Sequence, residues 1–256
     1  MVRRFEEFDF EKVPLSKSGI LSYKQCPLRF KKMVVDKIQG APSDAMQIGT
    51  WFHDDAEELY DKIDKEAILS GAITVTEEYM KYLPNEPQYH NFANIEQRRF
   101  DVMKENGNVE DFFPLHRELY LVDKELQFYG TVDRVDKDGD YYAVLDYKFS
   151  KYPKHQNAFS KHRLELAGYA HLVNQSGLLP DGGEVKYIGI IFVGEVPGVF
   201  YEALKPISVE AFHRNLVKVR EGVQARMFDK KRGYQCQWCP FDFDCTKEEA
   251  ETGDVK

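Results

Sequence analysis

Residues 127–148, QFYGTVDRVDKDGDYYAVLDYK, decide the fold class of this chain. Two runs rich in β-branched and aromatic residues, Gln127–Val135 and Tyr141–Lys148, flank the dipeptide Asp138-Gly139. Asp-Gly between two such runs is a strong signal for a β-hairpin, because glycine readily takes the positive φ that a tight turn needs. The stretch therefore predicts two adjacent antiparallel strands.

The hairpin register predicts which side chains meet. A loop centred on residues 138–139 makes Asp133 face Val144. Because side chains alternate between the two faces of a strand, Asp133, Asp146 and Lys148 then share one face. The two aspartates become diagonal neighbours, with backbones roughly 7–8 Å apart.

Two carboxylates at this spacing suit a hard divalent cation. Such a cation neutralises the charge of a phosphodiester and lowers the pKa of bound water, and Lys148 can hold or deprotonate that water or stabilise the transition state. The alternative is an ordinary solvent-exposed ion pair. Gly130, which lets a backbone or ligand come close, and the apolar run Ala143–Leu145 favour a functional site.

The remaining sequence predicts helices before and after a mixed sheet, and hence one α/β domain over residues 17–245. Residues 1–16 and the acidic residues 246–256 are expected to be loosely ordered tails. Helices are expected at Ser22–Val34, Met46–Ile63, Phe92–Lys104, Ala158–Asn174 and Val209–Phe228, and further strands at Glu118–Val122, Val185–Val193 and Val199–Leu204.

Composition sets broad limits on function. The chain has 256 residues and a net charge of −8, which argues mildly against a nucleic-acid binder, although bound cations would offset acidic groups at a metal site. The sequence shows no apolar signal region and no stretch long enough to span a membrane. We therefore expect a cytoplasmic protein without a membrane partner, whose cysteines are in a reducing compartment.

A basic stretch follows the second strand of the hairpin. Between residues 148 and 163 there is no acidic residue, and Tyr152 and Phe159 lie among the cations. Cations interleaved with aromatic rings suit phosphate contact and base stacking on single strands. The alternative is a solvated loop. The residues predicted to bind DNA are Lys151, Lys154, Lys161 and Arg163.

All four cysteines fit one thiolate site. Cys236, Cys239 and Cys245 form a C-x2-C-x5-C pattern, and Cys26 precedes Pro27 near the other end of the chain. Four thiolates bind either a tetrahedral zinc ion or a four-iron cluster, and spacing alone does not separate these two alternatives.

The segments Gly130–Val135 and Leu145–Lys148 resemble the PD-(D/E)xK nuclease superfamily and, more narrowly, its RecB-like nuclease domains. The resemblance implies a restriction-endonuclease-like core, with a mixed central sheet flanked by helices. It implies that Asp133, Asp146 and Lys148 are catalytic. It also places Asp133, Asp146 and Tyr147 in the site of a catalytic Mg2+ or Mn2+.

Helical positions extend the resemblance. His53 follows a glycine on its helix, as a metal-binding histidine does in RecB-like nucleases, whereas a core histidine is the alternative. The family motif Gln-x-x-x-Tyr corresponds to Glu165 and Tyr169, which implies catalytic roles for both, although Glu165 departs from the family glutamine. Glu118 lies where several relatives carry an acidic residue, and an edge-strand surface charge is its alternative reading.

The cysteines resemble those of the iron–sulphur class of RecB-like nucleases, which includes the CRISPR-associated adaptation nuclease and the nuclease domain of AddB. The resemblance implies a 4Fe-4S cluster that joins the two ends of the domain. It also implies an exonuclease that acts on single-stranded DNA ends in recombination, repair or CRISPR adaptation, with partner proteins of those processes and possible oligomers. The alternatives are a catalytically silent iron–sulphur DNA-binding module and a zinc-binding interaction protein.

Overall fold

The computed structural model describes residues 8–38, 40, 44–153 and 159–252, and the chain forms two compact units. The sheet unit comprises residues 43–123 and 130–212. The terminal unit comprises residues 1–42, 124–129 and 213–256. None of the helices described in either unit has the length and apolar character that a membrane crossing requires.

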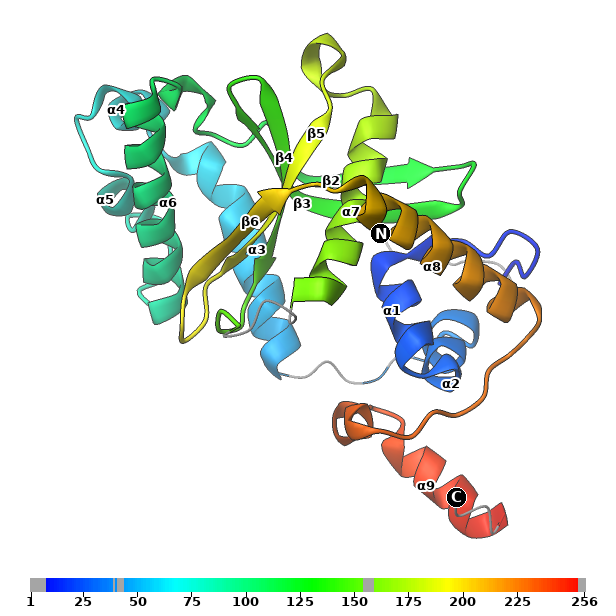
Figure 1. The fold of residues 1–256 in the computed structure, drawn as a ribbon. Coiled ribbons are helices and arrows are strands. Elements are labelled where there is room, and N and C mark those ends of the chain that lie inside the picture. Colours follow the sequence, from blue (N-terminus) through cyan, green and yellow to red (C-terminus); the bar gives the residue numbers. More distant parts are fainter. Residues whose placement is uncertain (1–7, 39, 41–43, 154–158, 253–256) are drawn as a thin grey trace. The chain divides into compact units, whose positions relative to one another are not determined.

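The sheet unit is built on a mixed β-sheet (Figure 1). The order is β3-β4-β5-β6, and β2 pairs with β3. The β3–β4 and β5–β6 pairs are antiparallel, whereas β4 and β5 are parallel. The strands are β2 His116–Asp123, β3 Phe128–Asp138, β4 Tyr141–Lys148, β5 Val185–Phe192 and β6 Gly198–Ala203.

The sheet centre follows from the apolar sequence of β4, in which residues 142–147 are all buried. Strands buried on both faces have continuous apolar runs instead of alternating ones. Helix α7, Ser160–Ser176, connects β4 to the parallel β5, and it ends at Gly177, whose φ of +68° is easy only for glycine.

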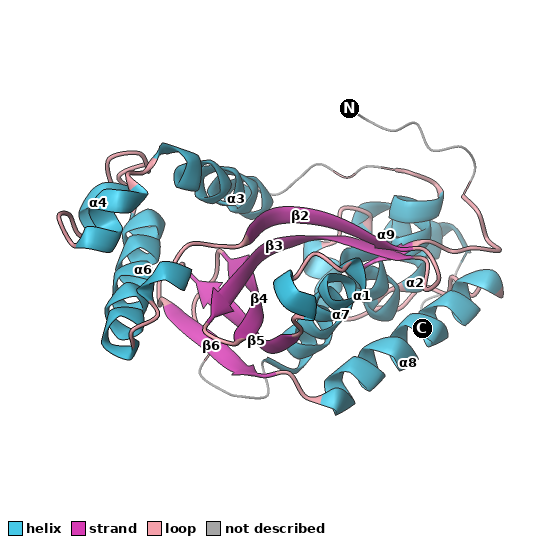
Figure 2. Ribbon diagram, turned by 90° about the horizontal axis from the view of Figure 1, so that it is seen from above, coloured by secondary structure: helices cyan, strands magenta, loops and turns pink. Residues whose placement is uncertain are grey.

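Helices α3 to α6 form a second layer against the sheet, away from α7 (Figure 2). Aromatic residues of α3 and α6 pack with Tyr147 of β4 in one buried cluster. The helices and the short turn that follows are α3 Asp44–Lys62, α4 Lys65–Ser70, α5 Val75–Tyr79, α6 Pro87–Asn106 and η2 Val109–Asp111. The expected α/β fold with helices on a mixed sheet is confirmed, although α4 and α5 are not among the predicted elements.

The predicted hairpin register is wrong by two residues. Asp138 pairs with Tyr141, so the turn is Gly139-Asp140, and Val144 pairs with Val135 instead of Asp133. Gly139 has a φ of +61°, and a two-residue hairpin turn that begins at glycine explains the shift. A shift of two residues keeps every side chain on its predicted face.

The first helix of the terminal unit begins earlier than predicted. Helix α1, Lys17–Gln25, is capped by Ser16, whose hydroxyl accepts a hydrogen bond from the Gly19 amide at 3.1 Å. Ser22, the predicted cap, is buried inside this helix. The chain extends at Cys26 before α2 Pro27–Phe30 and the π-helix η1 Lys31–Val35, so the predicted continuous helix is broken before proline.

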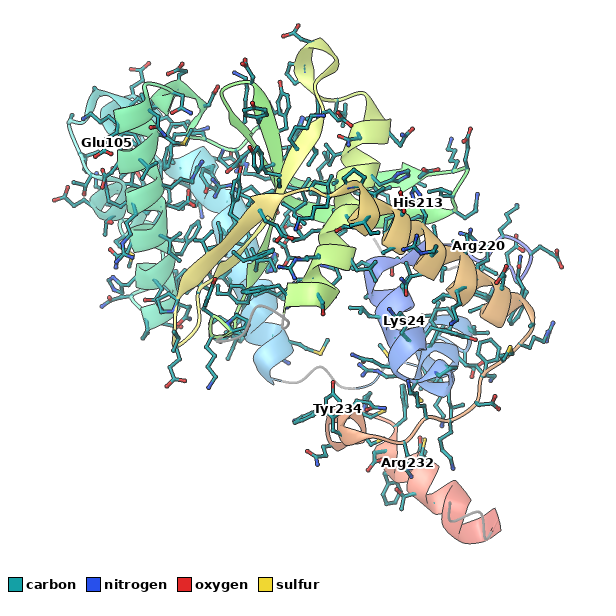
Figure 3. All side chains as sticks on the ribbon, in the orientation of Figure 1. Lys24, Glu105, His213, Arg220, Arg232 and Tyr234 are labelled. Carbon is teal, nitrogen blue, oxygen red and sulfur yellow. The ribbon has the colours of Figure 1, made fainter. Side chains whose placement is uncertain are left out.

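Both predicted tails contain regular structure. Leu15 and Ser16 form β1, which pairs in parallel with Phe128 and Tyr129, and Leu15 is fully buried. Helix α9, Asp242–Thr252, runs through most of the expected C-terminal tail. Arg232, which is labelled in Figure 3, donates hydrogen bonds to Asp242 and Thr246 of α9. The remaining elements are η4 Pro180–Gly182, α8 Pro206–Gln224 and η5 Tyr234–Trp238.

Candidate active site

The two predicted catalytic aspartates lie at the end of the β3–β4 pairing. The observed register ends at Arg134↔Leu145, and Asp133 and Asp146 are the next residue on each strand, with side chains on the face opposite to Leu145. Both carboxylates are buried, with 8% exposure for Asp133 and 3% for Asp146. Lys148 shares the face of Asp146, and its Nζ lies 2.5 Å from Asp146 Oδ2. The three residues of the core motif thus form one group.

Helix α3 and strand β2 add two further ligand candidates. One ligand atom each from His53, Glu118 and Asp133 lies within 4.8 Å of the others. His53 Nδ1 is 3.3 Å from Glu118 Oε1 and 3.6 Å from Asp133 Oδ2. Across the described ranges, this is the one place where three or more His, Cys, Asp or Glu ligand atoms come so close.

Glu118 is held in the site by an unusual backbone conformation. Its φ is +42°, in the left-handed region that non-glycine residues seldom adopt, although it lies within β2. Strained backbone of this kind persists only where the surrounding structure enforces it, and it is concentrated at functional sites. The placement beside His53 contradicts the reading of Glu118 as an edge-strand surface charge.

The carboxylates determine the protonation of His53. Burial lowers the pKa of His53, but the hydrogen bond to Glu118 and the charges of Asp133, Glu118 and Asp146 outweigh burial and raise it above its ordinary value. His53 is therefore part of an acidic site and not an apolar core histidine.

Tyr147 contributes its backbone to the site and its ring to the core. Its amide donates a hydrogen bond to Asp133 Oδ2 at 3.0 Å. Its hydroxyl accepts from Arg134 at 3.2 Å on the other face of the sheet, and burial raises its pKa to about 12. The predicted metal-binding role of Tyr147 therefore cannot use the phenol and would have to use the main-chain carbonyl.

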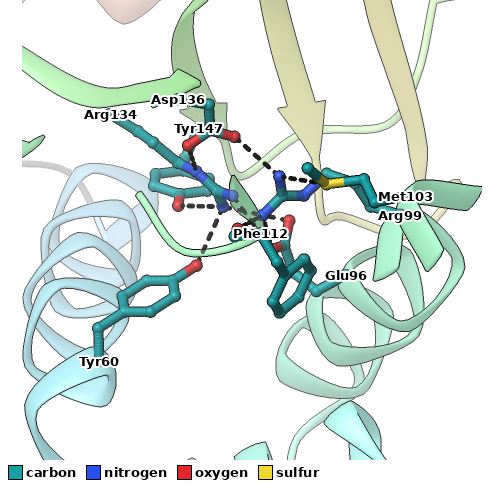
Figure 4. Close-up of polar contacts among 8 residues, drawn as sticks. All are labelled: Tyr60, Glu96, Arg99, Met103, Phe112, Arg134, Asp136 and Tyr147. Atoms are coloured by element: carbon teal, nitrogen blue, oxygen red, sulfur yellow. Dashed lines mark hydrogen bonds and ion pairs between the residues drawn. The ribbon is translucent and has the colours of Figure 1, made fainter. Parts of the chain in front are cut away.

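A buried charge cluster fixes the strand next to Asp133 (Figure 4). Arg134 is fully buried and donates hydrogen bonds to Asp136 Oδ1 at 2.6 Å and to Glu96 Oε2 at 3.2 Å. Arg99 pairs with the same two carboxylates, so two cations face two anions. Burial lowers the pKa of Arg134, but Asp136 and Glu96 outweigh burial and raise it. Tyr60 completes the cluster from α3.

Sequence reasoning missed this cluster. The signal was Arg134 itself, a charged residue between Val132 and Val135 in a predicted strand. A buried charge requires partners. Its partners on α3 and α6 could not be named without the fold.

Helix α7 carries the two residues of the predicted Gln-x-x-x-Tyr position. Tyr169 is buried, and its ring packs over Gly130, where a Cβ would lie 2.8 Å from Cε1 of the ring. Glu165 has one polar partner among the described residues, the His162 ring at 3.4 Å. Gly130 thus makes room for Tyr169, and catalytic roles for Glu165 and Tyr169 stay predictions.

The basic stretch is only partly available for DNA. Lys151 is exposed, whereas Arg163 forms a two-point ion pair with Glu202 of β6, at 2.5 and 3.1 Å. Phe159 is buried and stacks on Phe200, so the predicted base stacking by this ring is wrong. Lys154 lies outside the described residues, and the side chain of Lys161 is not described either.

The cysteines all belong to the terminal unit. Cys245 is buried, and Cys26, Cys236 and Cys239 are half-buried. The side chain of Gln235, next to Cys236, donates a hydrogen bond to the carbonyl of Gln25, next to Cys26, at 3.3 Å. All four sulfur atoms are described, and no three of them lie within 4.8 Å of one another.

The family model of the PD-(D/E)XK nuclease superfamily matches residues 14–246, and this chain therefore belongs to that superfamily. The match covers the whole hairpin, His53 and all four cysteines. Membership of this superfamily suggests hydrolytic nuclease chemistry, and His53, Glu118 and Asp133 form a plausible site for it.

Two solved structures are similar to this chain at low sequence identity. The crystal structure of a presumed exonuclease from Eubacterium rectale has a TM-score of 0.50 and 11% identity, and the alignment covers 93% of this chain and 92% of that chain. The crystal structure of SSO0001 has a TM-score of 0.42 and 11% identity, with 94% and 88% covered. No curated protein sequence matches the chain at a significant level.

Proposed function

We propose that this protein is a metal-dependent deoxyribonuclease that hydrolyses phosphodiester bonds and has its active site at the β3–β4 hairpin. The observation that carries the proposal is the group of His53, Glu118 and Asp133 ligand atoms within 4.8 Å, together with the Asp146–Lys148 pair. Membership of a nuclease superfamily supports this chemistry.

The side chains at the hairpin fit a divalent cation. Glu118, Asp133 and Asp146 carry three negative charges, against one on Lys148 and at most one on His53. Two of these carboxylates are almost fully buried, and buried anions need compensation. Because the set is dominated by carboxylate oxygens, it suits Mg2+ or Mn2+. When bound, such a cation neutralises phosphate charge and lowers the pKa of a bound water.

The other groups at the hairpin have separate tasks. The Lys148 ammonium can donate to a phosphate oxygen on which charge develops, or hold the attacking water, because Asp146 keeps its Nζ at the site. The Tyr147 amide holds Asp133 in position. We assign Tyr169 and Glu165 to the helical wall beside the hairpin, where Tyr169 contacts Gly130.

We further propose that the substrate is DNA and that cleavage starts from single-stranded ends. Support comes from the superfamily and from the fold of the presumed exonuclease of Eubacterium rectale. The exposed Lys151, just beyond the end of β4, is a cation for the substrate backbone. Recombination, repair and CRISPR adaptation are the processes that use such an activity.

Time courses on end-labelled DNA test this proposal. The parent is incubated with 5′-labelled and 3′-labelled single strands and duplexes, in Mn2+ or in EDTA. The proposal predicts Mn2+-dependent mononucleotides from single strands, released first from one end. Internal fragments would overturn the exonuclease assignment, and no cleavage of any substrate in Mn2+ would favour a catalytically silent DNA-binding module.

We propose a 4Fe-4S cluster for Cys26, Cys236, Cys239 and Cys245. The Gln235–Gln25 hydrogen bond supports a common site, because it joins the residues that precede two of these cysteines. Four thiolates bind either a four-iron cluster or a tetrahedral zinc ion, and the resemblance to the iron–sulphur class of RecB-like nucleases favours the cluster.

Metal analysis separates the two alternatives. Protein purified without oxygen should contain about four iron and four sulphide per chain, and be brown. Cys239→Ser should lose most of both. Stoichiometric zinc in place of iron would overturn the cluster and favour the zinc-binding alternative, without bearing on the hairpin site.

A further inference from the structure

A cavity of about 460 Å³ lies in the sheet unit between α6 and the face of the sheet that carries Leu145. Its sheet side is formed by Leu145, Ile191, Val199 and Tyr201, and its helix side includes Ile95 and Val102. Ligand sites typically occupy roughly 300–1,000 Å³, with an apolar lining and a few polar groups. Because Leu145 and Asp146 point to opposite faces of β4, the cavity is across the sheet from the catalytic carboxylates.

One wall of the cavity is a prepared aromatic platform. Tyr201 lines the cavity with 46% of its surface exposed, and its ring is stacked on Tyr187 with centroids 5.2 Å apart and planes 11° apart. Gly189 lies opposite Tyr201 in the sheet. A Cβ at Gly189 would approach the Tyr201 ring to 3.0 Å and Leu145 to 2.5 Å. Because Gly189 has no side chain, the Tyr201 ring can pack over the sheet at this position.

The cavity also holds one unneutralised positive charge. Arg98 lines it and is exposed, with no ion pair or hydrogen bond within the described part of the chain. The cations Arg99 and Lys137 also line the cavity, but they already form ion pairs, with Glu96 and Asp111 respectively. Arg98 is thus free to receive an anion.

One amide side chain adds to the polar lining. Asn94 lines the cavity and is exposed, and it lies about one helical turn, roughly 6 Å, from Arg98 on α6. A side-chain amide carries both donors and an acceptor, as the edges of nucleobases do. An aromatic platform, an amide and a spare guanidinium match three parts of one ligand: a flat heteroaromatic ring, its polar edge and a phosphate.

We propose that this cavity binds a nucleotide, with the base stacked on Tyr201 and the phosphate paired with Arg98. The same chemistry is offered by a free nucleoside monophosphate and by a nucleotide within a single strand. The site stands on α6 and the sheet face alone, so it does not depend on the nuclease proposal.

Equilibrium dialysis of labelled dAMP in EDTA tests the site without catalytic metal. Tyr201→Ala should weaken binding on the order of tenfold, because stacking on an aromatic ring is lost, whereas Tyr201→Phe should retain it. Tyr120→Ala is the matched control, since Tyr120 is also exposed, on β2. Arg98→Ala should weaken dAMP on the order of tenfold but leave deoxyadenosine unchanged, and Arg98→Lys should restore part of the loss.

A second arm identifies the source of the nucleotide. Binding of (dA)6 that depends on Tyr201 and Arg98, with no binding of dAMP, supports a site for a strand; dependent binding of dAMP supports a site for the free nucleotide. The proposal is overturned if neither probe binds the parent, or if Tyr201→Ala and Arg98→Ala bind both probes as the parent does.

Discussion

The amide of Tyr147 donates a hydrogen bond to Oδ2 of Asp133 at 3.0 Å, across the β3–β4 ladder. The same oxygen lies 3.6 Å from Nδ1 of His53. Asp133 therefore connects the strand that carries Asp146 to the helix that carries His53. Its carboxylate has two roles, since it accepts a hydrogen bond that supports the fold and it is a candidate metal ligand.

The variant Asp133→Asn separates the hydrogen-bonding role of Asp133 from its role as a metal ligand. The amide oxygen still accepts from Tyr147, so the fold should persist, but the lost charge should weaken Mn2+ binding at least about tenfold. Calorimetric titration with Mn2+ measures this change. Asp140→Asn, in the exposed turn of the same hairpin, should bind Mn2+ as the parent does. Equal affinities for both variants would remove Asp133 from the metal site.

The raised pKa of His53 predicts a pH-dependent stability of the metal-free protein. A histidine whose pKa is higher in the folded state stabilises that state fully below its ordinary pKa of about 6.5 and loses this effect as pH rises through the folded value. In EDTA, the parent should exceed His53→Gln in free energy of unfolding by more at pH 5.5 than at pH 9. Urea unfolding checks this, and a pH-independent difference would contradict it.

The buried Arg134 cluster predicts a large effect on stability. Arg134→Met leaves Glu96 and Asp136 with only Arg99 between them, and breaking a buried pair costs about 3–5 kcal/mol. Urea unfolding measures this loss. Arg98→Met, at an exposed position without an ion pair in the described structure, should change stability by no more than about 0.5 kcal/mol. A loss below about 1 kcal/mol for Arg134→Met would contradict the assigned role.

Within the basic stretch, Lys151 and Arg163 should differ in their effect on the binding of single-stranded DNA. Lys151→Ala should lower single-strand affinity and reduce the dependence of log affinity on log salt by about 0.7, the value for one phosphate contact. Arg163→Ala should leave that dependence unchanged, because Arg163 is paired with Glu202, and should instead lower stability. Fluorescence anisotropy over a salt series distinguishes the two, and the reverse pattern would refute this division.

Local sequence was sufficient for most of the fold. The Asp-Gly turn and the continuous apolar run of β4 predicted the hairpin and the buried centre of the sheet, and β4 has the bounds expected. The predicted register was wrong because the two-residue turn begins at Gly139, whereas the predicted turn was centred on residues 138–139. The faces were still correct, because a shift of two residues leaves them unchanged, and Lys148 pairs with Asp146.

Contacts between residues far apart in the sequence could not be predicted from local sequence patterns. Nothing local shows that Phe159 is covered by Phe200, or that Arg163 reaches Glu202 on another strand. The left-handed backbone of Glu118 within β2 is likewise not predicted by any residue propensity. The roles of the four cysteines and of Glu165 remain predictions from the resemblance.

The most direct test of the central claim is the rate of DNA cleavage by Asp146→Asn. Single-stranded DNA labelled at one end is incubated in Mn2+ with the parent, with Asp146→Asn and with Asp140→Asn, each shown to be folded by circular dichroism. If the hairpin carboxylates hold the catalytic cation, Asp146→Asn should be slower by at least about a hundredfold, while Asp140→Asn keeps the parental rate. Cleavage by Asp146→Asn at the parental rate would contradict the account.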